Sequence, residues 1–166
     1  MKFAAALLAF ALVLPPQSDL YAANTSHYVD ELSCSSGPYS LRLPDTYDAL
    51  RRIGALVSER VVREEKLGPY IARYRDLVFH GLRLGVVTYS NDAAKYQVTS
   101  AEIRSPQWKI AGPFRAGQAL PPKIGDVATK ALSSGATVEF SGEEDTVRVK
   151  LAGRRISVLT YLCVAE

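Results

Sequence analysis

The sequence predicts an α+β fold in which a mainly antiparallel sheet, built from meanders, carries two short helices packed on one face. Two observations support this prediction. Apolar and polar residues alternate with the two-residue period of strands in several stretches, and Gly and Pro residues separate those stretches. Helical patterns occur at two places between them. We therefore expect strands to form most of the sheet and the helices to cover it.

The C-terminal third contains the clearest strand patterns. Apolar and polar residues alternate in residues 137–140, 146–151 and 156–164, and polar stretches that contain Gly separate these segments. Alternation of this length between turn residues is typical of antiparallel strands. We expect a three-stranded meander here.

A second set of strands is predicted upstream. Residues 82–90 and 95–104 flank a turn at Asn91-Asp92 and predict a hairpin. Residues 77–79 read as a strand that precedes it. The hairpin would supply the other part of the sheet.

Two short helices are predicted between the strands. The first begins near Asp45, whose side chain can accept a hydrogen bond from an amide of the first helical turn. It ends at Gly54, which can adopt the left-handed conformation of a C-terminal cap. The second runs from about Ile124 to Ser133 and ends at Gly135. After each helix the sequence reads Gly-Ala, one residue and Val. This likeness indicates either an internal duplication of a helix-then-strands unit or merely two similar helix ends.

Residues 1–23 have the pattern of a cleavable export signal. A basic residue is followed by an apolar run over residues 4–14 and by small residues at 22–23. The run is shorter than the roughly 20 residues that span a bilayer, so we expect no membrane insertion after cleavage. Residues 24–166 are long enough for a single domain, which we expect in the periplasm or outside the cell.

The two cysteines, Cys34 and Cys163, lie near the two ends of that domain. An oxidising compartment favours their pairing, so we predict one disulfide. The alternatives are a metal pair or a nucleophilic thiol. The only histidines are His27 and His80, and nothing supplies a four-ligand zinc set. We therefore expect no metal and no cofactor.

The charge pattern argues against a nucleic-acid partner. The formal net charge is +3, and acidic residues are interspersed with basic ones along the chain. A nucleic-acid-binding protein is expected to cluster Lys and Arg on one stripe, with stacking aromatic residues nearby. We predict no nucleic-acid binding.

The sequence lacks the motifs of common catalytic sites, such as Gly-x-Ser-x-Gly, Ser-x-x-Lys, the phosphate loop, His-Glu-x-x-His and the dinucleotide fingerprint. His80 could act as a general base, but a turn or edge histidine bonded to backbone is the commoner case. The acidic residues 143–145 lack the ligand spacing of a calcium loop and predict a solvated hairpin tip. We expect no catalytic residues and a protein that is not an enzyme.

Residues that commonly anchor protein interfaces concentrate in two stretches. Tyr and Trp bury a large area with few rotatable bonds, and Arg makes planar bidentate contacts. The partner-binding candidates, in an expected connection at residues 68–76 and in an expected loop after Ser105-Pro106, are Tyr70, Arg73, Tyr74, Arg75, Trp108 and Lys109. The alternative is that the aromatic members cap the edge of the core. Their solvent exposure distinguishes the two interpretations.

The order of elements resembles a known type of module. A short helix that follows an extended stretch with Gly or Pro (41–44 and 114–117) and precedes a meander is similar to the tandem helix-plus-sheet modules of the β-lactamase-inhibitor-protein type and of small outer-membrane-assembly lipoproteins. The likeness covers most of residues 38–163. The chain departs from the lipoproteins because no Cys follows its apolar run. The resemblance implies a sheet used as a binding face, and fold likeness alone does not establish function.

Taken together, these features predict an exported, non-catalytic binding protein. Its expected partner is another exported or envelope protein, and its expected role is that of an inhibitor or immunity protein that occludes a toxic or lytic enzyme. One alternative is a small-ligand or envelope-polymer binder, which needs a concave pocket. The other is a hydrolase without a motif, which needs His80 close to a carboxylate. The sequence gives no oligomeric state.

Overall fold

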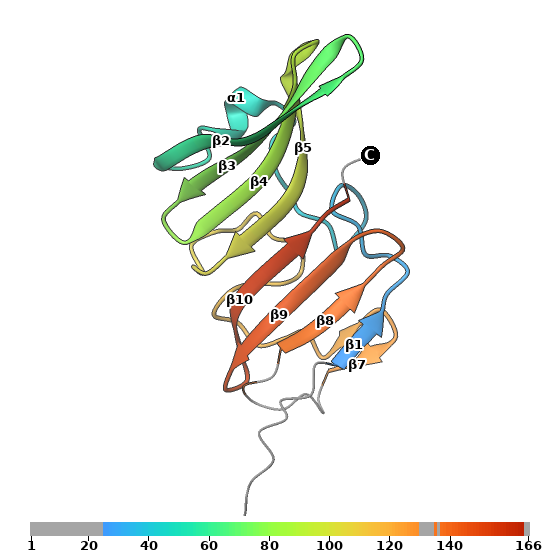
Figure 1. The fold of residues 1–166 in the computed structure, drawn as a ribbon. Helices are drawn as coiled ribbons and strands as arrows, with labels where there is room; N and C mark the ends of the chain where they lie inside the picture. The colour runs from blue at the N-terminus through green and yellow to red at the C-terminus, as the bar shows by residue number, and fades with distance from the viewer. Residues whose placement is uncertain (1–24, 130–134, 136, 165–166) are drawn as a thin grey trace, which may run out of the picture.

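An eight-stranded sheet with the strand order β1-β8-β9-β10-β5-β4-β3-β2 runs the length of the molecule (Figure 1). The computed structural model describes residues 25–129, 135 and 137–164, so the predicted export signal at residues 1–23 lies outside it. The elements in chain order are β1 (Thr25–Tyr28), α1 (Tyr47–Leu50), β2 (Leu56–Leu67), β3 (Tyr70–Phe79), β4 (Leu82–Tyr89), β5 (Asp92–Ile103), β6 (Lys123–Ile124), β7 (Val127–Ala128), β8 (Thr137–Ser141), β9 (Thr146–Ala152) and β10 (Arg155–Leu162).

The sheet consists of two meanders joined edge to edge. Strands β2 to β5 form the upper meander in Figure 1, and β8 to β10 form the lower meander. The seam between them is the antiparallel pairing of β5 with β10, which extends over four residue pairs from Leu159↔Ile103 to Leu162↔Ser100. β1 adds to β8 in parallel, and β6 and β7 form a separate two-stranded hairpin.

The lower meander confirms the sequence prediction for residues 137–164. Its three strands agree with the predicted segments to within one or two residues. Every second side chain is buried, except across a bulge after Ile156: Val138, Phe140, Val147, Val149, Leu151, Ile156, Leu159 and Tyr161. The predicted 82–90 and 95–104 hairpin is also present, as β4 and β5. A two-residue period with one buried face is what a strand covered on one side requires.

The hydrophobic core lies on one face of the sheet, which we call the inner face. Side chains from the sheet pack there against α1 and against the connections before β2 and between β5 and β6. The covering side chains include Val29, Leu41, Tyr47, Leu50, Trp108, Phe114 and Ile124. We call the opposite side of the sheet the outer face. A single contiguous core explains how a mostly β chain of this length can be stable.

The predicted α+β class with two helices is wrong, because the described residues contain only one helix, of four residues. α1 begins after Thr46, whose hydroxyl accepts a bond from the backbone amide of Ala49 (3.3 Å), so the cap is not Asp45. Gly54 is not a left-handed cap either. A Cβ at Gly54 would lie 2.6 Å from the Trp108 ring, so this glycine is needed for a close approach.

The predicted helix over Ile124–Ser133 is replaced in its described part by the β6–β7 hairpin. Gly125 at the turn has a φ of +53°, and its amide donates to the Tyr39 hydroxyl (2.8 Å), so the chain reverses there instead of continuing a helix. Residues 130–134 lie outside the described residues. The described residues therefore supply no second helix for the suggested duplication.

Candidate binding surface

The candidates in residues 68–76 lie on a strand, so the prediction of a connection there is wrong. Tyr70, Arg73, Tyr74 and Arg75 all belong to β3, and the connection is the Gly68-Pro69 turn before it. Successive side chains of a strand point to opposite faces. Tyr70 and Tyr74 therefore lie on the outer face, whereas Arg73 and Arg75 lie on the inner face.

Three tyrosines and one arginine come together on the outer face, near the tip of the upper meander, and we call them the tyrosine cluster: Arg63, Tyr70, Tyr74 and Tyr89. The Tyr70 and Tyr89 rings meet edge to face with centroids 5.8 Å apart. The Arg63 guanidinium carbon lies 3.9 Å from the centroid of the Tyr74 ring. Aromatic pairs and stacked guanidinium groups in such geometries attract each other.

The strand register explains why these rings cluster. Ala72 lies opposite Tyr89, and Val87 lies opposite Tyr74, so two buried small side chains separate the tyrosines on the same face. The rings themselves are partly buried and keep some contact with solvent. Burial raises the pKa of the Tyr89 hydroxyl, and the neighbouring Tyr74 and Tyr70 phenols raise it further. The three phenols are thus uncharged, and with the Arg63 cation they form a partly solvated aromatic surface.

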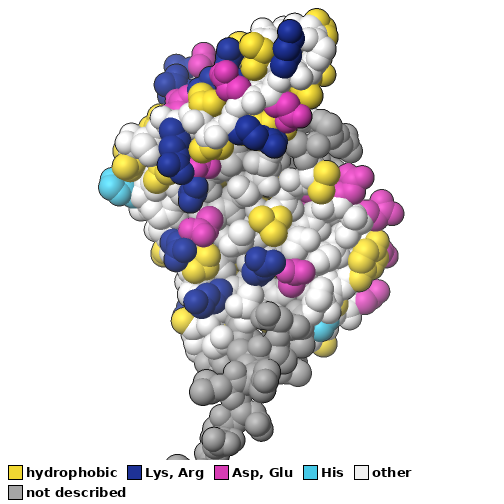
Figure 2. Space-filling model, in the orientation of Figure 1, with side chains coloured by type: hydrophobic (Ala, Val, Ile, Leu, Met, Phe, Trp, Pro, Cys, Tyr) yellow, Lys and Arg dark blue, Asp and Glu magenta, His cyan; other side chains and the backbone are white. Residues whose placement is uncertain are grey.

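Opposite charges pair across the rest of the outer face. Asp76 accepts bonds from Arg60 (3.1 Å) and Arg83 (2.6 Å), and Arg148 pairs with Glu139 (2.8 Å). Burial would raise the pKa of the Asp76 carboxyl, but the hydrogen bonds and charges of the two arginines outweigh that effect and lower it. Figure 2 shows basic and acidic side chains mixed over the face in view.

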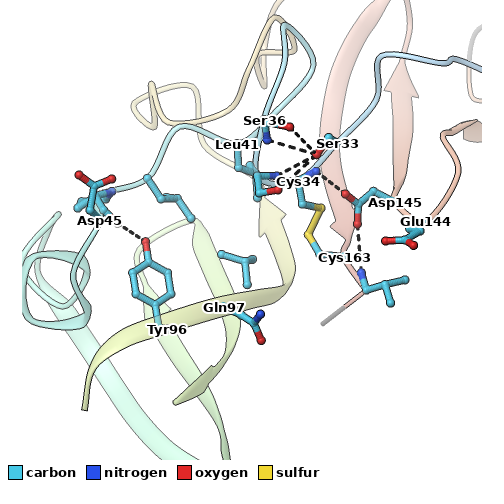
Figure 3. Close-up of a pocket in the computed structure, with 15 residues that line it drawn as sticks. Ser33, Cys34, Ser36, Leu41, Asp45, Tyr96, Gln97, Glu144, Asp145 and Cys163 are labelled. Carbon is cyan, nitrogen blue, oxygen red and sulfur yellow. Dashed lines mark hydrogen bonds between the residues drawn. A yellow bond between two sulfur atoms is a disulfide. The ribbon is translucent and has the colours of Figure 1, made fainter. Parts of the chain in front are cut away.

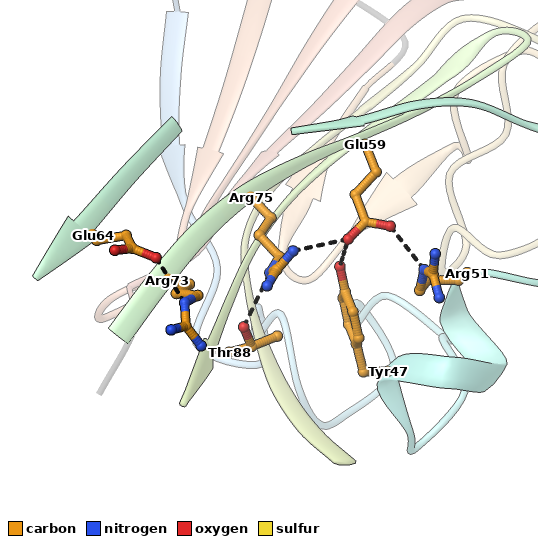
Figure 4. A network of polar contacts seen from close by, with 7 residues as sticks. All are labelled: Tyr47, Arg51, Glu59, Glu64, Arg73, Arg75 and Thr88. Carbon is orange, nitrogen blue, oxygen red and sulfur yellow. Dashed lines mark hydrogen bonds and ion pairs between the residues drawn. The ribbon is translucent and has the colours of Figure 1, made fainter. Parts of the chain in front are cut away.

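On the inner face, Glu59 connects the upper meander to α1 (Figure 4). Its carboxylate accepts bonds from the Tyr47 hydroxyl (2.8 Å), Arg51 Nε (2.8 Å) and Arg75 Nη1 (2.9 Å). Burial would raise the pKa of Glu59, but the bonds from Tyr47 and Arg51 and the two arginine charges lower it below its usual value. Burial and the bond to Glu59 raise the pKa of Tyr47 to about 12.

Arg73 and Arg75 both have partners within the chain, and Arg75 belongs to the Glu59 network. Arg75 also donates to the Thr88 hydroxyl (3.2 Å), and Arg73 pairs with Glu64 (2.7 Å). Both guanidinium groups are therefore engaged within the chain. Of the four candidates on β3, the two tyrosines are the ones that contribute to the outer face.

Trp108 is buried, with 9% of its surface exposed, which favours its interpretation as a cap of the core. Its Nε1 donates to the backbone oxygen of His80 (2.8 Å), and its ring meets Phe79 edge to face. Lys109 is exposed beside it, at the rim of a shallow pocket of about 390 Å³ that His80 also lines. No Asp or Glu is among the described residues that line this pocket.

The predicted disulfide between Cys34 and Cys163 is confirmed, with Cα atoms 5.7 Å apart (Figure 3). Asp145, in the turn between β8 and β9, supports it from both sides. One carboxylate oxygen accepts a bond from the Cys34 amide and the other from the Val164 amide (3.1 Å). The solvated-tip prediction for residues 143–145 therefore holds for Glu143 and Glu144, which are exposed, but not for Asp145.

A pocket of about 460 Å³ opens beside the disulfide. Residues from the chain before α1, from β5 and from the two ends of the disulfide line it, among them Ser33, Leu41, Leu43, Tyr96 and Asp145. Cys34, Asp145 and Cys163 are close enough together to hold a metal ion, but both sulfurs are bonded to each other and offer no thiolate.

Comparisons with protein-family models, curated proteins and solved structures find no match to this chain. In the described part of the chain, no helix is long and apolar enough to cross a membrane.

Sequence reasoning missed Arg63 and Tyr89 as members of the tyrosine cluster. Both lie on strands next to β3, and the two positions come together only through the strand register. Tyr89 ends the predicted strand at residues 82–90, so pairing that strand with an extended 70–79 would have placed it near Tyr74. No local pattern identifies Arg63, because β2 has no regular alternation of apolar and polar residues.

Proposed function

We propose that this chain is an exported, non-catalytic binding protein whose outer face, at the tyrosine cluster, engages another exported or envelope protein. The observation that carries the proposal is the set of three partly exposed tyrosines with Arg63 stacked on one of them. Tyr and Arg are enriched among the residues that contribute most to protein–protein binding. Aromatic rings fixed on strands lose little conformational freedom when a partner covers them.

The position of the cluster suits occlusion of a concave partner. The β2–β3 hairpin projects at the top of Figure 1, and its turn, Gly68-Pro69, stands next to Tyr70. Gly68 has a φ of +58°, which a tight reversal requires, and a Cβ there would meet nothing within 4 Å. A narrow aromatic tip of this kind could enter a partner's cleft, as an inhibitor or immunity protein does.

Rigid support behind the cluster favours the same role. The Glu59 network holds β2, β3 and α1 together on the inner face, and the disulfide fastens the chain before α1 to the end of β10. Preorganised binding surfaces retain more of their contact energy because less ordering is needed on association.

The proposal is tested by capture of partners from an envelope extract on the immobilised protein, followed by mass spectrometry. Tyr74→Ala and Tyr70→Ala variants are compared with Tyr28→Ala, a matched control in which an exposed tyrosine (59%) is removed from β1 at the other end of the sheet. A defined protein that binds the native chain and the control, but not the cluster variants, supports the proposal. Equal capture by all four proteins, or capture of no defined protein, contradicts it. Thermal unfolding of each variant shows that the fold is retained.

A second candidate function is small-ligand binding in the pocket beside the disulfide. Its volume of about 460 Å³ lies within the range of roughly 300–1,000 Å³ typical of ligand sites, and its lining combines apolar side chains with Ser and Asp. A Val98→Trp variant would fill part of this pocket. A ligand that raises the melting temperature of the native protein but not of this variant would favour this second function over the first.

A further inference from the structure

The upper meander ends in a long strand with a free edge. β2 spans Leu56–Leu67 and pairs only with β3; within the described residues no strand pairs with its other edge. The opposite edge of the sheet, β1, has four residues. A free edge presents unpaired backbone amide and carbonyl groups, which are a template for pairing with another strand.

The same strand exposes apolar side chains. Val57, Val61 and Val62 are 54%, 44% and 51% exposed, and they are three of the six markedly exposed large apolar residues in the described part of the chain. Edge strands that stay single usually carry charged or proline residues and few exposed apolar ones. β2 carries both charged and exposed apolar side chains. The order of its charges indicates which strand it could pair with.

The charges of β2 are complementary to those of a second β2 in the antiparallel direction. With a two-fold axis between Val62 and Arg63, Arg60 lies opposite Glu65 of the second copy, and Glu59 lies opposite its Lys66. Each pair occurs twice by symmetry. A shift of two residues in one direction sets Arg60 opposite Arg63 and Glu59 opposite Glu64, so like charges meet, and the same shift in the other direction sets Arg60 opposite Leu67, so the Arg60–Glu65 pair is lost. Opposite charges directly across a strand pair are favourable, and like charges are unfavourable.

A β-bulge makes this alignment consistent with the two faces of the sheet. The register with β3 skips one residue between Val61 and Arg63. Even-numbered side chains before this bulge therefore point to the same face as odd-numbered side chains after it. Arg60 lies opposite Asp76 and Glu65 opposite Ala72, and both therefore point to the outer face. Without the bulge, residues five apart would point to opposite faces and could not pair. Arg60 and Glu65 are also exposed enough (68% and 45% of the side chain) to reach a second copy.

We propose that two copies of this chain pair through β2, in the antiparallel alignment centred between Val62 and Arg63, and form one continuous sheet across both copies. This inference does not depend on the proposed function. The symmetry axis is perpendicular to the sheet, so the two outer faces are continuous. Both tyrosine clusters would then lie on the same side of the dimer.

Sedimentation equilibrium of the purified protein up to about 100 µM, with charge-reversal variants, tests the proposal. Arg60→Glu and Glu65→Arg each place like charges opposite one another at two symmetric positions, and each should weaken the dimer about tenfold or more. The double variant, Arg60→Glu with Glu65→Arg, restores opposite charges and should return the dissociation constant to within about threefold of the native value. Arg154→Glu, which reverses an exposed charge in the β9–β10 turn, is the control and should have no effect.

Two results overturn the proposal. One is a monomer at every concentration. The other is a dimer that the single reversals leave unchanged, or that the double variant fails to restore, because such a dimer would use another surface or another register. Arg60 also pairs with Asp76 within its own chain, so the melting temperature of each variant is measured first. Glu65→Arg does not alter that contact but removes the pairing of Glu65 with Arg63 (3.5 Å), so a Glu65→Gln variant, which loses that pairing without adding a positive charge, is its control and should weaken the dimer less than Glu65→Arg.

Discussion

The strands of the lower meander bury every second side chain, whereas β2 at the edge of the upper meander exposes side chains on both faces. β9 alternates between buried and exposed positions along most of its length, but all twelve residues of β2 are at least partly exposed. The difference follows from position. β9 has a strand on either side and a covered inner face, while β2 has one neighbour. Alternation of apolar and polar residues therefore indicates that one face of a strand is buried. A strand without a buried face, such as β2, lacks that signal.

Removal of the disulfide should cause the largest loss of stability among these predictions, because the disulfide fastens the C-terminal end of the lower meander. A Cys34→Ser, Cys163→Ser double variant frees two residues that are 129 positions apart in the sequence. On the chain-entropy model, the free energy of unfolding should fall by about 4 kcal/mol. Denaturant titration of the oxidised native protein and the variant measures the difference. A loss below about 1 kcal/mol would contradict this expectation and mean that the unfolded chain without the disulfide is already restricted by residual structure.

The same substitution in each meander should give unequal effects. Val149 on β9 is fully buried, and Val62 on β2 is 51% exposed. Val149→Ala should reduce the free energy of unfolding by about 2–3 kcal/mol, because it removes buried methyl groups and leaves a cavity. Val62→Ala should change it by no more than about 0.5 kcal/mol. Urea unfolding at a low protein concentration, where self-association is minimal, provides both values. Equal losses would contradict the contrast drawn between the strands.

Asp145→Ala should destabilise the protein by about 1.5–3 kcal/mol, because the Cys34 and Val164 amides both lose a charged acceptor. Glu144→Ala, one residue away and exposed, is the matched control and should have little effect. Denaturant titration of the two variants compares them directly. Similar values for both would show that solvent replaces the Asp145 carboxylate.

Acid should weaken the upper meander through Glu59, although this effect is the smallest of the four. Its pKa is lower in the folded chain than its usual value of 4.5, so its contribution is complete above about pH 4.5 and is lost as the pH falls through the lowered value. Asp76, with a usual value of 3.8, acts in the same direction. Glu59→Gln should therefore show a shallower loss of stability between about pH 5 and pH 3. Urea unfolding across that range measures the slope, and identical slopes would contradict the role of the network.

The part of the fold that the sequence could predict is the part where one face of a strand is buried. The lower meander and the β4–β5 hairpin have that periodicity, and the single pair of cysteines leaves one pairing. Most of β3 and all of β2 were harder to predict. The charged residues of β2 and the Tyr and Arg residues of β3 are accommodated by cross-strand partners, such as Arg73 with Glu64, that no local window contains.

The helix errors have a related cause. The apolar residues around Ile124 match a helical face, but Gly125 at a φ of +53° reverses the chain and buries Ile124 in the core from a short hairpin. Tertiary packing overrides weak helical propensity in such segments. The candidate site was predicted in part, because Tyr70 and Tyr74 could be selected by type, whereas Arg63 and Tyr89 become neighbours only through the strand register.

The fit of Trp108 against Gly54 has a spectroscopic consequence. Trp108 is the only tryptophan, and it lies on the inner face, sealed between Gly54 and Phe79. Its fluorescence should therefore be insensitive to a partner that covers the outer face and should respond only when the connection after β5 shifts. A blue-shifted emission that stays constant during binding, beside a change in tyrosine signal, would locate the contact on the other side of the sheet without any structure of the complex.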